Sequence, residues 1–178
     1  MGAFNLVLRT TDGGRSWERW SDRTENPRNL HLYAVRRIGA DLYVAGEQGL
    51  LMKLDRRAER FRALGTPYEG TFFGLTGTGD AVIVFGLRGN AFRSTDGGAR
   101  WSRVETGVEV SLTAATITDD RRIVLMSQEG HALVSGDAGA TFQWARLERP
   151  TPTAAVAVVA PDELVVAGTL GVRVQALR

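Results

Sequence analysis

The chain lacks several features that would narrow its function at once. It has no cysteine, which excludes disulfides, zinc–thiolate sites and a cysteine nucleophile. Its two histidines, His31 and His131, are 100 residues apart, and no carboxylate spacing around them indicates a metal site. No apolar run approaches the roughly 18 residues of a membrane-spanning helix. The opening stretch, MGAFNLVLRTTDGG, does not have the pattern of a signal peptide.

Net charge, lysine and proline are also low. A formal net charge of +2 argues against a general role in binding nucleic acid or membranes. All but one of the 22 basic residues are arginines, the exception being Lys53, which reflects either a coding bias or anion recognition. Only five prolines accompany 21 glycines, a composition typical of short strands joined by many tight turns.

What the sequence does contain is a repeated turn. RTTDGGRSWERW at 9–20 returns as RSTDGGARWSRV at 93–104, more loosely as LVSGDAGATFQWARL at 133–147, and in worn form as MKLDRRAERF at 52–61. The turn aspartates lie 43, 41 and 41 residues apart, at Asp12, Asp55, Asp96 and Asp137. A second landmark repeats at 40, 41 and 41 residues, at Gly49, Gly89, Gly130 and Gly171. Two landmarks with one period establish a structural repeat of about 41 residues.

Each period contains four short alternating or apolar runs with turn signals between them and no sustained helical period. Four strands per repeat of this length predict an all-β protein, a β-propeller of four-stranded antiparallel blades. We expect complete blades at 30–65, 72–106 and 111–148, and partial blades at 1–20 and 152–177. About four blades are few for a closed propeller, and an open arc would expose an apolar edge. We therefore expect either part of a larger ring, with any leader segment further upstream, or an arc that pairs with a second copy.

The chemistry of the turn predicts a structural latch. The aspartate side chain can accept backbone N–H groups further along the turn, and the glycine two residues later suits a positive φ. The aromatic residue five positions after the aspartate would then pack between blades. The residues with these roles are Asp12, Gly14 and Trp17; Asp96, Gly98 and Trp101; and Asp137, Gly139 and Phe142. A single carboxylate per turn is too few for a calcium site.

These turns resemble the Asp-box, or BNR, repeat, whose pattern is Ser/Thr-x-Asp-x-Gly-x-Ser/Thr-Trp/Phe. Residues 10–17 and 135–142 match it throughout, and 94–101 departs at Arg100. Further segments resemble bacterial relatives of the photosystem II stability/assembly factor family: NLHLYAV at 29–35, AGEQGLL at 45–51, PYEGTFFGL at 67–75 and GLRGNAFRSTDGG at 86–98. The resemblance implies a seven-bladed ring that binds another protein. In that family the partner is a membrane-protein client, held by an arginine-rich surface. It also implies a periplasmic or envelope location, and no cofactor.

Blade topology divides the turns between two faces. The Asp turns share one face with the turns that join first and second strands, and propeller ligands usually bind the other face. That second face is expected to hold the turns at Gln48, Arg88, Asn90, Glu129 and Thr169 and the connections at Asp22, Arg23, Asn26, Arg28, Tyr68 and Glu69. We take Arg23, Arg28, Gln48, Tyr68 and Arg88 as candidate partner-binding residues, the alternative being that the arginines are scattered and merely solvated.

The alternative function is an Asp-box glycoside hydrolase, sialidase-like or xyloglucanase-like. The Arg-Ile-Pro motif of sialidases is absent, and the adjacent Tyr68 and Glu69 would point apart in an extended segment. Xyloglucan hydrolases use two opposed aspartates. The candidates by residue type are Asp22, Asp41, Asp80, Asp119, Asp120 and Asp162, and most of these fall in turns on the face that carries the Asp turns. The sequence therefore favours a binding protein without catalytic or metal-ligating residues.

Overall fold

The structure, a computed structural model, describes residues 1–178 as an all-β molecule with three single-turn 3-10 helices. The N-terminal sheet has two strands, β1 (Leu8–Arg9) and β2 (Glu18–Arg19), between η1 (Ala3–Asn5) and η2 (Ser21–Arg23). The first blade comprises β3 (Leu32–Ile38), β4 (Asp41–Gly46), β5 (Leu51–Asp55) and β6 (Arg60–Ala63). The second blade comprises β7 (Phe72–Thr78), β8 (Ala81–Gly86), β9 (Ala91–Ser94) and β10 (Ser102–Val104), with η3 (Leu87–Gly89) between β8 and β9. The third blade comprises β11 (Leu112–Ile117), β12 (Ile123–Ser127), β13 (Ala132–Ser135) and β14 (Gln143–Ala145), and the C-terminal sheet comprises β15 (Ala155–Ala160), β16 (Glu163–Gly168) and β17 (Gly171–Ala176).

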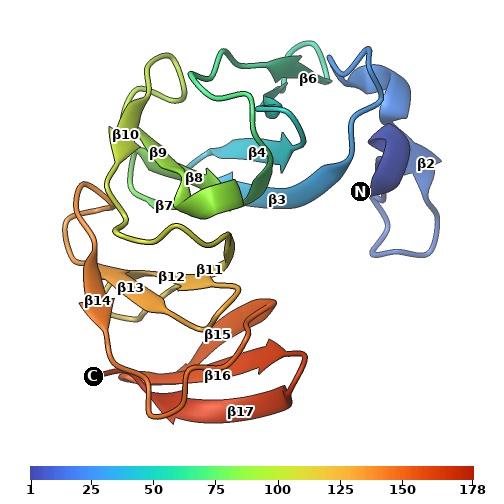
Figure 1. Ribbon diagram of the computed structural model, residues 1–178. Helices are drawn as coiled ribbons and strands as arrows, with labels where there is room; N and C mark the ends of the chain where they lie inside the picture. Colours follow the sequence, from blue (N-terminus) through green and yellow to red (C-terminus); the bar gives the residue numbers. More distant parts are fainter.

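The sheets are arranged as an open arc of propeller blades (Figure 1). Strands that follow one another in sequence pair antiparallel, so each sheet meanders outward from its first strand. The first strands β3, β7, β11 and β15 are neighbours along the inside of the arc. The N-terminal and C-terminal sheets stand at opposite ends and do not meet (Figure 1). The predicted fold class is therefore confirmed as a partial β-propeller whose sheets do not close into a ring. The structure contains no helix of the length and apolarity needed to cross a bilayer.

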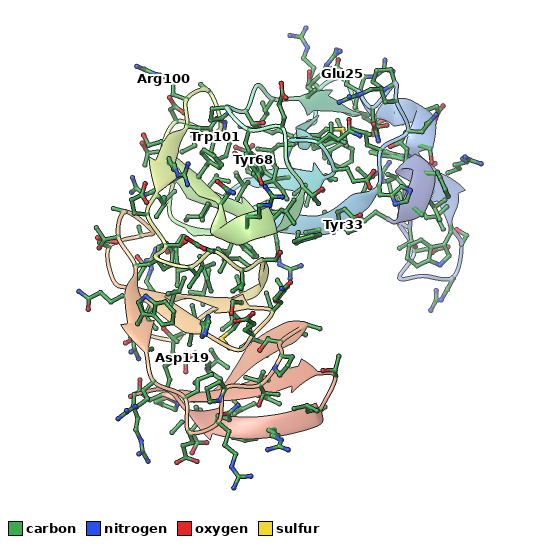
Figure 2. All side chains as sticks on the ribbon, in the orientation of Figure 1. Glu25, Tyr33, Tyr68, Arg100, Trp101 and Asp119 are labelled. Atoms are coloured by element: carbon green, nitrogen blue, oxygen red, sulfur yellow. The ribbon has the colours of Figure 1, made fainter.

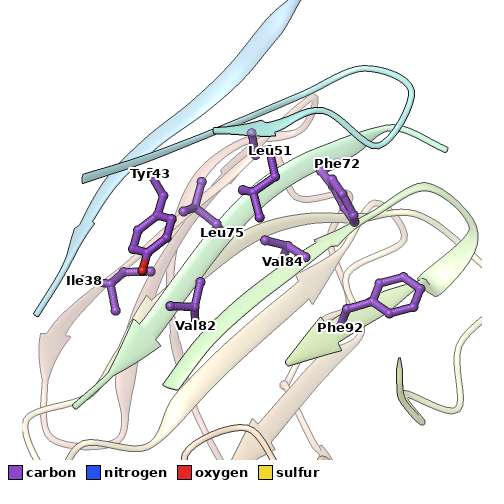
Figure 3. Close-up of a cluster of buried hydrophobic side chains, with 9 residues drawn as sticks. Ile38, Tyr43, Leu51, Phe72, Leu75, Val82, Val84 and Phe92 are labelled. Atoms are coloured by element: carbon purple, nitrogen blue, oxygen red, sulfur yellow. The ribbon is translucent and has the colours of Figure 1, made fainter. Parts of the chain in front are cut away.

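Apolar clusters between neighbouring sheets hold the arc together. The second strands β4, β8 and β12 are apolar on both faces because each lies between two clusters. In β8, for example, Val82 and Val84 face the first blade, and Ile83 and Phe85 face the third. Figure 3 shows the cluster between the first and second blades, which includes Ile38, Tyr43, Leu51, Phe72, Leu75, Val82, Val84 and Phe92. The N-terminal sheet packs Val7 and Trp20 on the opposite face of the first blade.

The Asp turns have the hydrogen bonds that their sequence predicts. At Asp12, the carboxylate accepts the Ser16 N–H at 2.9 Å and the Ser16 hydroxyl at 2.6 Å. The Thr10 hydroxyl donates to the same carboxylate at 2.8 Å and accepts the Gly14 N–H at 2.8 Å. These donors lower the pKa of Asp12 to about 2. Gly14, Gly98 and Gly139 have φ angles of +90°, +96° and +80°, a region that costs glycine little.

The aromatic residue of the turn behaves differently at the start of the chain. Trp101 and Phe142 pack against the apolar clusters formed with the preceding blade. Trp17 is 59% exposed, so the expectation that it packs between blades does not hold. Its indole instead contacts its own turn, where the N–H donates to the Gly14 carbonyl at 3.1 Å.

Candidate partner-binding surface

The two faces of the arc carry different connections. On one face, here called the turn face, the Asp turns lie beside the turns that join first and second strands. The Tyr43 hydroxyl donates to the Gly97 carbonyl across this face at 3.3 Å. On the opposite face, here called the crossover face, the connections between blades cover the turns that join second and third strands. The Gly49 N–H donates to the Gly70 carbonyl at 2.7 Å, and the Thr66 hydroxyl donates to the Gly49 carbonyl at 2.9 Å.

A β-bulge recurs where the innermost strands begin, at the crossover face. The pairing of β3 with β4 jumps from Leu32–Gly46 to Ala34–Ala45, which leaves Tyr33 as the extra residue. The same jump leaves out Phe73 in β7 and Thr113 in β11. A bulge bends the strand and re-aims the extra side chain. The rings of Tyr33 and Phe73 meet edge to face with their centroids 5.6 Å apart, and Figure 2 shows Tyr33 beside β3 on the inner side of the arc.

The backbone in front of each bulge passes very close to the second strand. A Cβ at Gly46 would overlap the His31 carbonyl oxygen, and a Cβ at Gly86 would overlap the Thr71 carbonyl oxygen. The Glu47 and Leu87 N–H groups donate to these two carbonyls at 3.1 and 3.0 Å. The glycines that end the second strands therefore permit the close approach that sets up the bulge.

A hollow of about 310 Å³ lies beside the two rings, among the innermost strands. Hydrophobic residues, Tyr33 and Phe73 among them, make up most of its lining, and Arg36 and Thr113 also line it. No carboxylate lines the hollow. The two aromatic rings and the polar groups of the lining suit a partner segment that has both apolar and polar groups.

Polar groups surround the aromatic pair. The Glu47 carboxylate accepts the His31 N–H at 2.8 Å and the Tyr33 hydroxyl at 3.4 Å. Partial burial, and then the nearby negative charge of Glu47, raise the pKa of the Tyr33 hydroxyl. On the same face, the Arg28 guanidinium donates to the Gln48 side-chain oxygen at 2.6 Å. The Tyr33 ring thus has an acceptor, Glu47, at its hydroxyl, and the crossover face also carries the cationic Arg28.

Two more of the sequence-predicted residues lie on the crossover face. Tyr68 belongs to the connection between the first and second blades, and its hydroxyl donates to the Leu87 carbonyl at 3.1 Å. The Asn90 side chain donates to the Tyr68 hydroxyl at 3.3 Å. Arg88 is exposed in η3 with a φ of +55°, and no ion pair neutralises it. The positions of Arg28, Gln48, Tyr68 and Arg88 are consistent with one surface.

Arg23 lies elsewhere. The segment that contains it runs parallel to β6, with a bridge between Thr24 and Phe61. The Arg23 guanidinium meets the Glu59 carboxylate at 3.4 Å, just before β6 begins. That is the turn-face end of β6, whereas Arg28 follows at its crossover-face end. The structure therefore does not bring Arg23 together with Arg28 and Arg88.

Sequence reasoning did not single out Tyr33, Phe73 or Glu47. A signal for the first two exists, because Tyr33, Phe73 and Thr113 stand at intervals of 40 residues, one in each first strand. The alternation of side chains along a strand does not show where a β-bulge inserts an extra residue. The sequence therefore does not reveal that the side chains of Tyr33 and Phe73 point to the same place. Nothing in the sequence indicates that Glu47 contacts Tyr33.

Three of the six aspartates considered for glycoside hydrolysis form ion pairs. The Asp41 carboxylate meets the Lys53 ammonium at 2.6 Å. The Arg122 guanidinium pairs with Asp120 at 2.7 Å and also with Asp162, and the second pair links the third blade to the C-terminal sheet. The contacts of these three carboxylates are those of structural ion pairs.

The fold and this surface define the class of the protein as a partial β-propeller with a concave aromatic surface. No protein family model matches the chain. Its sequence is similar to the photosystem II assembly lipoprotein Ycf48 of Synechococcus sp. (strain CC9902), with 27% identity over 143 residues. That match covers 76% of this chain and 39% of the relative, so the chain spans well under half of the curated relative's length.

Solved structures show the same fold. A structure of YCF48 bound to D1 peptide matches 99% of this chain and 62% of that chain, with a TM-score of 0.67 and 13% identity. Virginiamycin B lyase from Staphylococcus aureus matches 96% of this chain and 62% of that chain, with a TM-score of 0.74 and 12% identity. At these identities the likeness concerns the fold alone. Together with the sequence similarity, it describes a propeller that is like a photosystem II assembly factor.

Proposed function

We propose that this propeller is a non-enzymatic protein-binding module that holds an extended segment of a client protein on its crossover face. The observation that carries the proposal is the repeated bulge, which places Tyr33 and Phe73 beside one hollow. Aromatic anchors beside a pocket are the usual source of binding energy at protein interfaces. Arg28 and Arg88 add donors for the carbonyl or carboxylate groups of the client.

The likeness to assembly factors supports this proposal. One matched structure contains YCF48 bound to a peptide, and the sequence relative is named as an assembly lipoprotein. We extend the proposal to a client that is a membrane protein and to an envelope location. The three Asp turns are proposed to be Asp-box repeats with a structural role, since their side-chain hydrogen bonds close the turn itself.

The enzymatic alternative is less well supported by the geometry. Some matched propellers are lyases, so the fold permits catalysis. A glycoside hydrolase needs two carboxylates facing one substrate site. The hollow is lined by none, and Asp41, Asp120 and Asp162 pair with basic side chains.

A capture experiment tests the proposed surface. The purified chain would be immobilised and exposed to a detergent extract of envelope proteins, and the captured proteins would be identified and quantified. We expect Tyr33→Ala with Phe73→Ala to reduce capture at least tenfold, because aromatic anchors dominate interface energies. Charge reversal of Arg28 and Arg88 is expected to weaken capture most at low salt, where electrostatic attraction is screened least.

Arg23→Glu is the matched control, because Arg23 is an exposed arginine at the other end of β6. The proposal predicts unchanged capture by this variant. Equal loss from Arg23→Glu and from Arg28→Glu would show that the crossover face is not the binding surface. A parallel screen for release of sugars from glycans would reveal the enzymatic alternative.

A further inference from the structure

A second exposed aromatic residue lies close to the proposed binding surface. Phe4 occupies the middle of η1, the turn that leads into β1, and its side chain is 73% exposed. Its ring meets the His31 imidazole edge to face, with the ring centroids 4.7 Å apart. The hollow beside Tyr33 and Phe73 does not include this second pair of rings.

The turn that carries Phe4 is the turn that joins second and third strands in every blade. The Gly2 N–H donates to the Leu6 carbonyl, just as the Gly86 N–H donates to the Asn90 carbonyl around η3. The counterparts of Phe4 in the three complete blades are exposed as well, namely Gln48, Arg88 and Glu129. The exposure of Phe4 is therefore a property of this turn wherever it occurs.

The backbone of this turn disfavours a phenylalanine. Phe4 has a φ of +52°, close to the +51° of Gln48 and the +55° of Arg88. Bulky side chains rarely adopt this left-handed region, whereas glycine adopts it freely. The exposed ring of Phe4 also gains little from burial within the chain. Residues held in such a conformation cluster at functional sites, so the phenylalanine indicates contact with a partner.

Glu47 links Phe4 and His31 to the aromatic pair at the hollow. Its Oε1 atom lies 3.7 Å from the His31 Nδ1 atom and accepts the Tyr33 hydroxyl at 3.4 Å. Its Oε2 atom accepts the His31 backbone N–H at 2.8 Å. The Tyr33 ring in turn meets the Phe73 ring. Four rings therefore follow one another as an aromatic row, in the order Phe4, His31, Tyr33 and Phe73, and both oxygens of Glu47 hold its middle.

The spacing of the aromatic row suits an extended partner segment. His31 and Tyr33 are two residues apart and reach the same Glu47 oxygen, so their side chains point to the same side. In any extended segment, residues i and i+2 also share one side and lie roughly 7 Å apart. A segment along the row would place two such side chains on the two pairs of rings. Apolar side chains pack favourably on aromatic rings, and the residue between them would face away.

We propose that the client segment is an extended apolar–polar–apolar stretch, with one apolar side chain on the Phe4–His31 pair and the other on the Tyr33–Phe73 pair. This inference rests on the proposed function, because the second pair belongs to the proposed client site. It adds a second subsite, at Phe4, and it fixes the spacing of the two apolar side chains that the client must carry.

Defined peptides test the spacing on the full 178-residue chain. Fluorescein-labelled peptides of serine and glycine would carry one leucine, two adjacent leucines, or two leucines separated by one serine, and fluorescence anisotropy would measure their affinities. We expect the separated pair to bind at least fivefold more tightly than the adjacent pair, which has the same composition. Equal affinities for the two pairs, or no binding by any of the peptides, would overturn the inference.

Phe4→Ala tests the second subsite. It should reduce the affinity for the separated pair to that for the single leucine, and the single-leucine peptide should bind as before because Tyr33 and Phe73 remain. Trp17→Ala is the matched control, since Trp17 is an exposed aromatic residue of the Asp turn in the same sheet; it should change neither affinity. An unchanged preference for the separated pair in Phe4→Ala would contradict the inference. A mass above that of the monomer in light scattering, removed by Phe4→Ala, would make a second copy the occupant and contradict it as well.

Phe4→Gly separates binding from folding. Glycine adopts a φ of +52° without strain, so this variant should lose the preference for the separated pair without a lower thermal midpoint. A lower midpoint together with the lost preference would assign Phe4 a structural role, and the inference would be wrong. The proposed function fails by a different result, namely capture of envelope proteins that survives Tyr33→Ala with Phe73→Ala. If that capture is lost but Phe4→Ala leaves peptide binding unchanged, only the subsite at Phe4 is wrong.

Discussion

At the scale of single residues, two Asp turns with matching sequences are expected to contribute differently to the stability of the fold, because only one of them packs against a neighbouring blade. Asp12 and Asp137 accept equivalent hydrogen bonds from Ser16 and Thr141, and each has its pKa lowered to about 2. Solvent can replace the protein donors around Asp12, because its whole turn is exposed. The turn around Asp137 is docked on the second blade through the Ala138 carbonyl.

We predict that Asp137→Ala destabilises the protein more than Asp12→Ala. Loss of the carboxylate frees the turn from its docked shape, which should lower the free energy of unfolding by about 1–2 kcal/mol. Urea denaturation at pH 7 measures both variants. Equal losses in the free energy of unfolding would mean that packing against the second blade does not increase the contribution of the turn to stability.

The same carboxylate also determines the expected pH dependence. The pKa of Asp137 is about 2 in the folded chain against an ordinary value of 3.8. The folded state thus binds this proton less readily than the unfolded state, so the stabilisation is present above pH 3.8 and is lost as the pH falls towards 2. The difference in stability between the natural chain and Asp137→Ala should narrow over that range. A difference that is constant from pH 5 to pH 2 would contradict the role of the charge.

At the scale of strands and turns, two glycines that end second strands have a steric role. The backbone of the paired first strand passes against the α-carbons of Gly46 and Gly86, at the His31 and Thr71 carbonyls. The bulges at Tyr33 and Phe73 follow two residues later. The two glycines thus help to position the aromatic pair.

We predict that Gly86→Ala destabilises the chain by about 1–3 kcal/mol, because the added methyl group overlaps the Thr71 carbonyl and the backbone must shift. Gly136→Ala is the control, since nothing lies within 4 Å of a Cβ at that position. Thermal unfolding of both variants measures the difference. Similar midpoints would show that the bulge tolerates a side chain at Gly86.

At the scale of the whole molecule, the arrangement of the blades decides which residues meet. The first strands β3, β7 and β11 are neighbours along the inside of the arc, so Tyr33 and Phe73, which lie 40 residues apart in the sequence, line one hollow. Their two rings meet edge to face.

The sequence by itself determined the repeat of about 41 residues, the four strands of each blade and the closed hydrogen bonds of the Asp turns. These features depend on residues that are near one another in the chain, so local pattern is sufficient to predict them. It also predicted that Arg28, Gln48, Tyr68 and Arg88 share the crossover face, where they lie; that this face binds a partner stays a prediction. Only the tertiary structure decided that Arg23 pairs with Glu59, at the turn-face end of β6. It also decided that bulges direct Tyr33 and Phe73 to one hollow, and that the turn at Asp12 is exposed to solvent. Each of these depends on register or packing between segments distant in sequence, where a shift of one residue reverses the direction of a side chain.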